Sequence, residues 1–179
     1  TWQWNSQYAY TDQNKTSSKD LGSLRSGERA YIGFTAKNTG NMTWRYDGAN
    51  PLRVGTVEPR ERTSSFESGS NWLGRTRPVA MKEASVPPGG IGTFEFWITG
   101  ASPGTFNERF GLVAEGRTWF NDTGLSYGIK VPQDIYTWKW NSQYAYTNES
   151  KTIPRDLNTL HPGERAYIGF TAKNTGNMT

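Results

Sequence analysis

The feature that most constrains this chain is a duplication: residues 1–43 and 137–179 align without a gap and differ at eleven positions. Each copy opens with the same aromatic stretch, TWQWNSQYAYT in the first and TWKWNSQYAYT in the second. The offset of 136 residues has the length of a whole domain, not of a solenoid repeat. We therefore expect a tandem repeat, with a complete unit at 1–136 and the first strands of a truncated next unit at 137–179.

The differences between the two copies are concentrated in one polar stretch. Ten of the eleven lie between Asp12 and Ser26, whereas the run GERAYIGFTAKNTGNMT that follows is the same in both copies. The second copy has Pro154 and Pro162 in this stretch, and proline fits poorly in a central strand. Because loops tolerate sequence change, we expect an exposed connection between two strands here.

The opening stretch has the alternation of a half-buried β-strand. Trp2, Trp4, Tyr8 and Tyr10 share one face of an ideal strand, and polar residues share the other. This aromatic face has two interpretations: it belongs to a core, or it is an exposed platform on which sugar rings stack. The same alternatives apply to its counterparts in the second copy, which are Trp138, Trp140, Tyr144 and Tyr146.

The rest of the first unit also alternates with a period of two, and no segment has a sustained helical period. The clearest predicted strands lie at 29–37, 52–57, 93–99 and 125–131. Turn sequences such as VPPGG and SPGT separate the strands. The pattern predicts an all-β protein with an antiparallel sandwich. In the long polar segment between two of the strands, the expected core anchors are Phe66, Trp72 and Leu73.

Two stretches resemble a known family. LRSGERAYIGFTAKNTGNMTW and VPPGGIGTFEFWITGASPGTFNERFGLVAEGRTWFND are similar to the two halves of the NBR1-type immunoglobulin-like module, also called the FW domain. The resemblance implies an immunoglobulin-like β-sandwich and a non-catalytic, modular role, as in the copies found in large bacterial surface and cell-wall-associated proteins. Phe34 stands where eukaryotic members usually have a tryptophan. Their cargo binding is therefore not implied for this chain.

Catalytic chemistry finds little support in the sequence. His161 is the only histidine and is replaced by Arg25 in the first copy, so no repeated unit requires a histidine triad or metal site. No serine lies in a known nucleophile motif, and no cysteine is present. Interleaved charges between 58 and 77 indicate a solvated ion-pair network, with a glycosidase-type carboxylate pair as the less favoured alternative. We expect neither an enzyme nor a cofactor or metal.

The charge balance limits the partners. Twenty Lys and Arg residues against sixteen Asp and Glu residues give a formal net charge of +4, which is a mixed surface and not a nucleic-acid-binding stripe. No apolar run approaches the roughly 20 residues that span a bilayer. The sequence therefore predicts no nucleic-acid partner and no membrane span in this segment.

Two functions from different classes remain. The first is a structural repeat of an extracellular stalk, adhesin or fibre, in which the duplicated aromatic strands dock on neighbouring copies, head to tail. Both copies require the same complement, residues 44–136, which occurs once. The alternative is a module that binds cell-wall or host glycan through exposed aromatics. Its expected ligand-facing residues, besides the aromatic strand, are Trp72, Arg60, Arg62 and Arg75.

Overall fold

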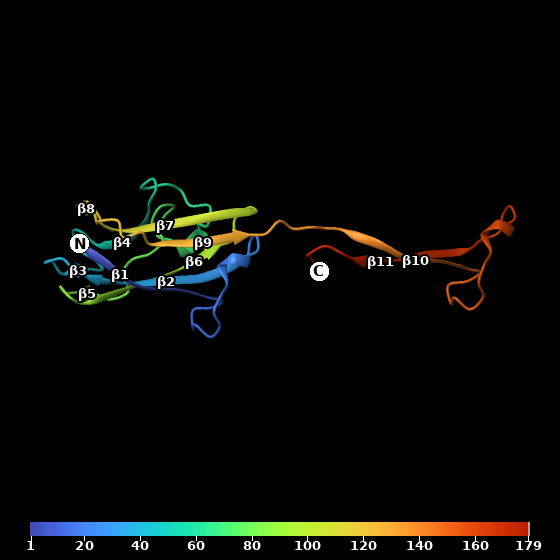
Figure 1. Cartoon of the computed structure of the whole chain (residues 1–179), viewed down its shortest axis with the longest axis horizontal. Coiled ribbons are helices and arrows are strands. Elements are labelled where there is room, and N and C mark those ends of the chain that lie inside the picture. Colours follow the sequence, from blue (N-terminus) through green and yellow to red (C-terminus); the bar gives the residue numbers. More distant parts are fainter. Residues whose placement is uncertain (179) are drawn as a thin grey trace. The chain divides into compact units, whose positions relative to one another are not determined.

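A computed structural model describes residues 1–178 of the chain. The chain divides into two compact units, Thr1–Gln133 (unit 1) and Asp134–Thr179 (unit 2). The division lies three residues before the boundary expected from the repeat. Both units are built from β-strands and short 3₁₀ turns (Figure 1). Within the described residues, no helix has the length and apolar character needed to cross a membrane.

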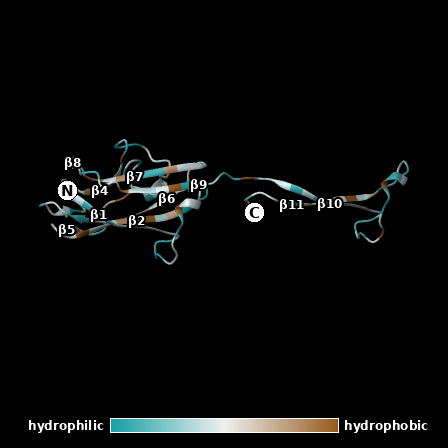
Figure 2. Cartoon of the chain, in the orientation of Figure 1, coloured by the Kyte–Doolittle hydropathy of each residue, from teal (hydrophilic) through white to brown (hydrophobic). Residues whose placement is uncertain are grey.

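The first sheet of unit 1 is antiparallel, in the order β1-β2-β6. It consists of β1 (Trp2–Tyr10), β2 (Arg29–Asn38) and β6 (Ile91–Thr99). Burial alternates along β2 and β6, so that one face of each strand is buried. Figure 2 shows hydrophobic residues along β2. The buried positions are Ala30, Ile32, Phe34, Ala36, Phe94, Phe96 and Ile98. The strands predicted at 29–37 and 93–99 are confirmed.

The second sheet is centred on β7 (Gly104–Ala114). This strand pairs antiparallel with β4 (Leu52–Thr56), β8 (Thr118–Trp119) and β9 (Ser126–Val131). A small separate ladder joins β3 (Trp44–Arg45) to β5 (Ser85–Val86). In Figure 1, β7 and β9 lie in the upper layer of unit 1, and β2 lies in the lower layer.

The core of unit 1 lies between the two sheets and is rich in aromatic rings. Phe96 of β6 meets Phe110 of β7 edge-on, with ring centroids 5.2 Å apart. Trp72 meets both rings edge-on, at interplanar angles of 88° and 69°, and is 6% exposed. These contacts across the layers give the all-β, sandwich-like architecture that the sequence predicts.

The long polar segment is anchored at two of the three expected positions. Phe66 and Trp72 are buried, but Leu73 is 59% exposed, so its predicted anchoring role is wrong. The 3₁₀ turn η2 (Gly69–Asn71) precedes Trp72 and directs its indole inward, where Nε1 donates to the carbonyl of Trp97 at 2.7 Å. The next residue along the extended chain then points outward.

The connection between β1 and β2 is less exposed than the sequence suggests. It contains the 3₁₀ turn η1 (Leu21–Ser23), capped by Asp20, whose side chain accepts a hydrogen bond from the Gly22 amide at 2.8 Å. Leu21 and Leu24 are buried in the core. Both leucines are retained in the second copy, but the polar and variable residues around them led to the expectation of an exposed connection.

Unit 2 contains one antiparallel hairpin. Its strands are β10 (Trp138–Tyr146) and β11 (Tyr167–Asn174), and the 3₁₀ turn η3 (Leu157–Thr159) lies between them. Asp156 caps η3 as Asp20 caps η1. Within unit 2, the linker is held against the end of the hairpin, because the Ile135 amide donates to Asn177 Oδ1 at 2.7 Å.

Candidate functional site

The duplicated segment forms the same hairpin in both units. We call β1 with β2 the first hairpin, and β10 with β11 the second hairpin. Their registers match pair by pair, from Trp2 opposite Asn38 to Trp138 opposite Asn174. Even the internal ring contact is reproduced, with Trp2–Phe34 and Trp138–Phe170 centroids each 6.0 Å apart. The hairpin geometry is therefore a local property of the repeated sequence.

A β-bulge sorts the aromatic residues of β1 onto two faces. The register shifts between Trp4 and Ser6, so that Trp2 and Trp4 stand opposite the inward-facing residues of β2. Tyr8 and Tyr10 stand opposite the outward-facing residues Gly33 and Tyr31. The prediction that all four share one face is wrong, because one extra residue in a strand moves every following side chain to the other side. The same bulge separates Trp140 from Ser142.

The inner face of the first hairpin is covered by the rest of unit 1. Trp2 is 2% exposed, and its Nε1 donates to the Asn121 carbonyl at 2.8 Å. Phe34 is completely buried and stacks on Phe94 of β6, with centroids 4.9 Å apart. The Tyr127 hydroxyl of β9 donates to the Gly33 carbonyl at 2.7 Å. Burial raises the pKa of Tyr127, so the hydroxyl remains a donor.

The same inner face of the second hairpin is exposed. Trp138 and Phe170 are each 63% exposed, and Ile168 is 65% exposed, although their counterparts in unit 1 are buried. Leu157 and Leu160, which correspond to the two buried leucines of the first connection, are also exposed. Within the described part of unit 2, β11 pairs only with β10. Its other edge corresponds to the edge of β2 that pairs with β6.

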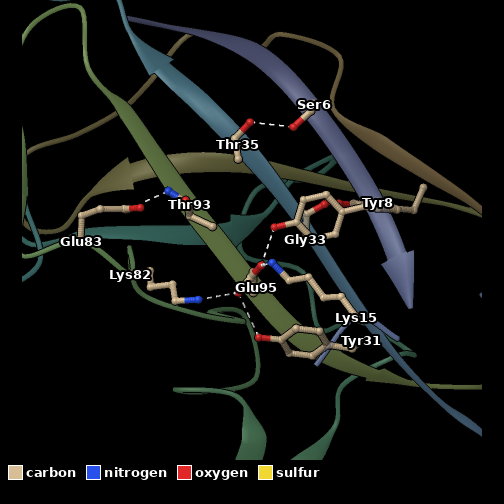
Figure 3. Close-up of polar contacts among 11 residues, drawn as sticks. Ser6, Tyr8, Lys15, Tyr31, Gly33, Thr35, Lys82, Glu83, Thr93 and Glu95 are labelled. Carbon is tan, nitrogen blue, oxygen red and sulfur yellow. Dashed lines mark hydrogen bonds and ion pairs between the residues drawn. The ribbon is translucent and has the colours of Figure 1, made fainter. Parts of the chain in front are cut away.

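The outer face of the first hairpin holds a polar cluster around Glu95 of β6. The Glu95 cluster comprises Tyr8, Lys15, Tyr31, Lys82 and Glu95 (Figure 3). The Tyr8 hydroxyl donates to Glu95 Oε1 at 2.5 Å, and the Tyr31 hydroxyl donates to Oε2 at 3.3 Å. Lys15 pairs with Oε1, and Lys82 Nζ lies 3.0 Å from Oε2. Each carboxylate oxygen thus has a tyrosine and a lysine partner.

These partners hold Glu95 in its ionised form. Its side chain is only 4% exposed, and burial by itself favours the neutral acid. The hydrogen bonds from Lys15, Tyr8 and Lys82 outweigh that effect and lower the pKa of Glu95 to about 2. Burial and the neighbouring carboxylate raise the pKa of Tyr31 to about 12. The cluster is therefore a carboxylate bound by two phenols and two ammonium groups.

The second hairpin retains three members of this cluster. Tyr144, Lys151 and Tyr167 correspond to Tyr8, Lys15 and Tyr31. Lys15 and Lys151 both have a positive φ, near 60° and 54°. Lys151 Nζ lies 4.6 Å from the ring centroid of Tyr144, close to the 4.9 Å that separates Lys15 from the Tyr8 ring. The glutamate and Lys82 lie outside the duplicated segment.

The residues predicted as an alternative ligand face do not meet at one site. Trp72 belongs to the core, so its ring is closed to a ligand in this structure. Arg62 forms a bidentate ion pair with buried Glu108: Nη1 lies 3.2 Å from Oε1 and Nη2 lies 2.7 Å from Oε2. Arg60 lies over the Trp119 ring, and Arg75 Nε is 3.7 Å from Glu67. The predicted network of ion pairs is thus present, but these four residues form no shared face.

Apart from Tyr8, sequence reasoning did not single out the residues of the Glu95 cluster. One signal was present in the sequence: Glu95 is an acidic residue inside the otherwise apolar strand TFEFWIT. The partners Lys15 and Tyr31 come from distant segments, and period-two reasoning gives no register between separate strands. Comparisons of the chain with protein-family models, curated proteins and solved structures found no match.

Proposed function

We propose that this chain is a non-catalytic structural repeat of an extracellular stalk, adhesin or fibre, in which hairpins are covered by strands of neighbouring copies. One observation carries the proposal: the same hairpin is buried in unit 1 and uncovered in unit 2. Exposed apolar faces of this kind mark interaction surfaces in soluble proteins.

The strand order of unit 1 supports an immunoglobulin-like repeat. One sheet has the order β1-β2-β6, and in the other β7 pairs with both β4 and β9. We assign these strands, in chain order, to A-B-E of one sheet and C-F-G of the other, as in immunoglobulin domains. The first two strands of such a domain cannot bury their inner face alone, which explains why the second hairpin requires a complement.

We expect the complement of the second hairpin from a neighbouring copy of the repeat and not from unit 1 itself, because the linker is short. Trp2 bonds to Asn121 and Gln7 to Ser126, so β1 and β9 run in the same direction. Val131 therefore lies beyond the Tyr10 end of β1, roughly 30 Å from Trp2 at about 3.3 Å per residue. The chain from Val131 to Trp138 spans at most about 25 Å. The second hairpin thus falls short of replacing the first in its own unit.

Sedimentation velocity of the intact chain over a wide concentration range tests the proposal. We expect association that increases with concentration and is lost when Thr137–Thr179 is deleted, because unit 1 is compact by itself. The matched control is Lys139→Gln, which restores the first-copy residue on the polar side of the strand and should leave association unchanged. An intact chain that stays monomeric at every concentration would overturn the proposal.

A second candidate function is binding of cell-wall or host glycan. The exposed rings of Trp4, Trp138 and Trp140 favour it, since sugar rings stack on exposed aromatic side chains. Retention of the intact chain on peptidoglycan or another polysaccharide, reduced by Trp140→Ala, would support this candidate. No retention on any polysaccharide would contradict it.

A further inference from the structure

A tryptophan lies over a pair of glycines on the outer face of the second sheet. Gly55 of β4 stands opposite Gly111 of β7, and the preceding residue of one strand and the following residue of the other, Val54 and Leu112, are in the core. A Cβ atom on Gly55 would lie 2.3 Å from Trp119 Cη2, and one on Gly111 would lie 3.9 Å from Trp119 Cζ3. The two glycines therefore leave the space in which the indole ring rests against the sheet.

A pocket of about 270 Å³ lies beside this ring. One wall is the loop that follows β4, residues 57–60, and the other is the segment 119–122, with Gly111 also in the lining. Trp119 is only half-buried, so part of its ring lines the pocket. Pockets that enclose drug-sized ligands measure roughly 300–1,000 Å³, so this smaller one has room for a single small ring.

Arg109 of β7 binds one carboxylate from each wall of the pocket. Its Nη1 pairs with Glu58 Oε1, and its Nη2 lies 3.0 Å from Asp122 Oδ2. The two acidic side chains are still 53% and 54% exposed. Among the described residues, no hydrogen bond or ion pair reaches Glu58 Oε2. Because a carboxylate accepts about four hydrogen bonds, both groups can accept further hydrogen bonds from a ligand.

The charges around the pocket cancel. Glu58 and Asp122 are balanced by Arg109 and by Arg60, which is exposed and whose guanidinium carbon lies 5.4 Å from the centroid of the Trp119 ring. A charged ligand would lose hydration without gaining a net opposite charge, so the balance favours a neutral one. A neutral sugar fits this chemistry, because its C–H face packs on an aromatic ring and its hydroxyl groups donate to carboxylates.

We propose that Trp119, Glu58 and Asp122 form a binding site for a neutral pyranose sugar, which stacks on the indole ring and donates hydroxyl hydrogen bonds to the two carboxylates. Arg60, in the same wall as Glu58, is the donor available to a sugar oxygen. The inference rests on the second candidate function, glycan binding, and identifies its site and sugar class. It does not depend on how the second hairpin is covered.

The test is an NMR titration of the ¹⁵N-labelled intact chain with glucose, mannose and N-acetylglucosamine, each added separately. For at least one of these sugars we expect saturable shifts of the Trp119 indole N–H and of the Glu58 and Asp122 amides. The indole signal of Trp72, which is buried in the core, should not move. Glucuronate and glucosamine, which carry a charge, should bind more weakly than the neutral sugars.

Two variants and a matched control assign the binding to this pocket. Glu58→Gln should weaken binding about tenfold, because hydrogen bonds to a charged acceptor are stronger than those to a neutral one. Trp119→Ala should abolish the saturable shifts. Glu67→Gln makes the same change in an ion pair outside the pocket, with Arg75, and should leave the affinity unchanged. Circular dichroism confirms that each variant is folded, and the exposed position of Glu58 keeps the test valid if Trp119→Ala unfolds.

The outcomes separate this inference from the candidate function on which it rests. Retention on a polysaccharide without shifts at Trp119 would overturn the site while glycan binding stands. Tighter binding of glucuronate or glucosamine would overturn the assignment to a neutral sugar, and equal affinity in Glu58→Gln would overturn the role of the carboxylates. No saturable shift with any sugar, together with no retention on any polysaccharide, would overturn both the site and glycan binding.

Discussion

The two hairpins of this protein have nearly the same sequence and the same register, yet one is inside a core and the other is uncovered. Trp2 and Phe34 are buried by residues from the 44–133 part of unit 1, whereas Trp138 and Phe170 have no such cover within unit 2. The comparison separates the pairing of the strands from their burial in a core, two steps that usually occur together. Pairing, bulge and caps are encoded within about forty residues, while burial depends on strands outside the duplicated segment.

The polar outer faces of the two hairpins differ in the same way. Tyr8, Lys15 and Tyr31 surround a carboxylate, whereas within the described residues no hydrogen bond or ion pair joins their counterparts to one. The tyrosine–lysine arrangement is therefore formed by the hairpin itself, without the acidic residue.

The largest expected difference between the hairpins is at the stacked phenylalanine. Phe34→Ala should lower the free energy of unfolding of unit 1 by about 3–5 kcal/mol, because it opens a cavity beside Phe94. Phe170→Ala should change stability by less than about 0.5 kcal/mol in the monomer, since the ring is exposed. Urea denaturation followed by circular dichroism measures both. Equal losses would show that the second hairpin is covered after all.

Removal of the acidic partner should have the next largest effect. Glu95→Gln is expected to cost unit 1 about 1.5–3 kcal/mol at neutral pH, because two tyrosines and two lysines lose a charged acceptor. The unfolding of unit 1, followed by urea denaturation, should show the loss. The second hairpin contains no equivalent of Glu95, so its hydrogen-exchange rates should not change.

The pH dependence of the same variant sharpens this result. Glu95 has a folded-state pKa of about 2, below its usual 4.5, so its contribution is present above about pH 4.5 and disappears as the pH falls towards 2. Glu28 also has a lowered pKa, through hydrogen bonds from Lys19 and the Arg25 amide, so acid sensitivity should be reduced but not abolished in Glu95→Gln. Unfolding midpoints from pH 7 to pH 2 measure the difference. Parallel curves for the variant and the parent would contradict this origin of acid sensitivity.

A smaller difference in stability is expected between the equivalent glycines Gly33 and Gly169. Gly33→Ala should destabilise unit 1 by about 1–3 kcal/mol, because the added methyl group meets the Phe94 carbonyl oxygen, which cannot move without disturbing β6. For Gly169→Ala the three nearest atoms all belong to the movable Tyr144 side chain, so we expect a change below about 0.5 kcal/mol. Thermal unfolding distinguishes the two. A large loss for Gly169→Ala would mean that the edge of β11 is already occupied.

The smallest difference is expected where the two hairpins have similar surroundings. Trp4 and Trp140 are 44% and 58% exposed, and both precede the bulge. Trp4→Ala and Trp140→Ala should each reduce stability by less than about 1 kcal/mol. Chemical denaturation of the two variants provides the check. A loss for Trp4→Ala as large as that for Phe34→Ala would place Trp4 in the core.

The sequence predicted the strands better than the faces of those strands. The alternation along β2, β6 and β9 correctly identified buried positions such as Ile32, Phe94 and Ile129. In β1 the same reasoning placed four aromatics on one side, because a bulge leaves no mark in a pattern of apolar and polar residues. The Glu95 cluster was not predicted, since its members come from β1, β2, β6 and two loops that only the folded chain brings together.

The sequence by itself determined the duplication, the all-β character and the presence of the same hairpin twice. These properties follow from local alternation, turn residues and residue identity, which act over short distances along the chain. Only the tertiary structure decided which copy is buried, which face each aromatic residue occupies and which tyrosines and lysines meet a carboxylate. Those outcomes depend on contacts between distant strands, and the duplicated segment contains only one side of each contact.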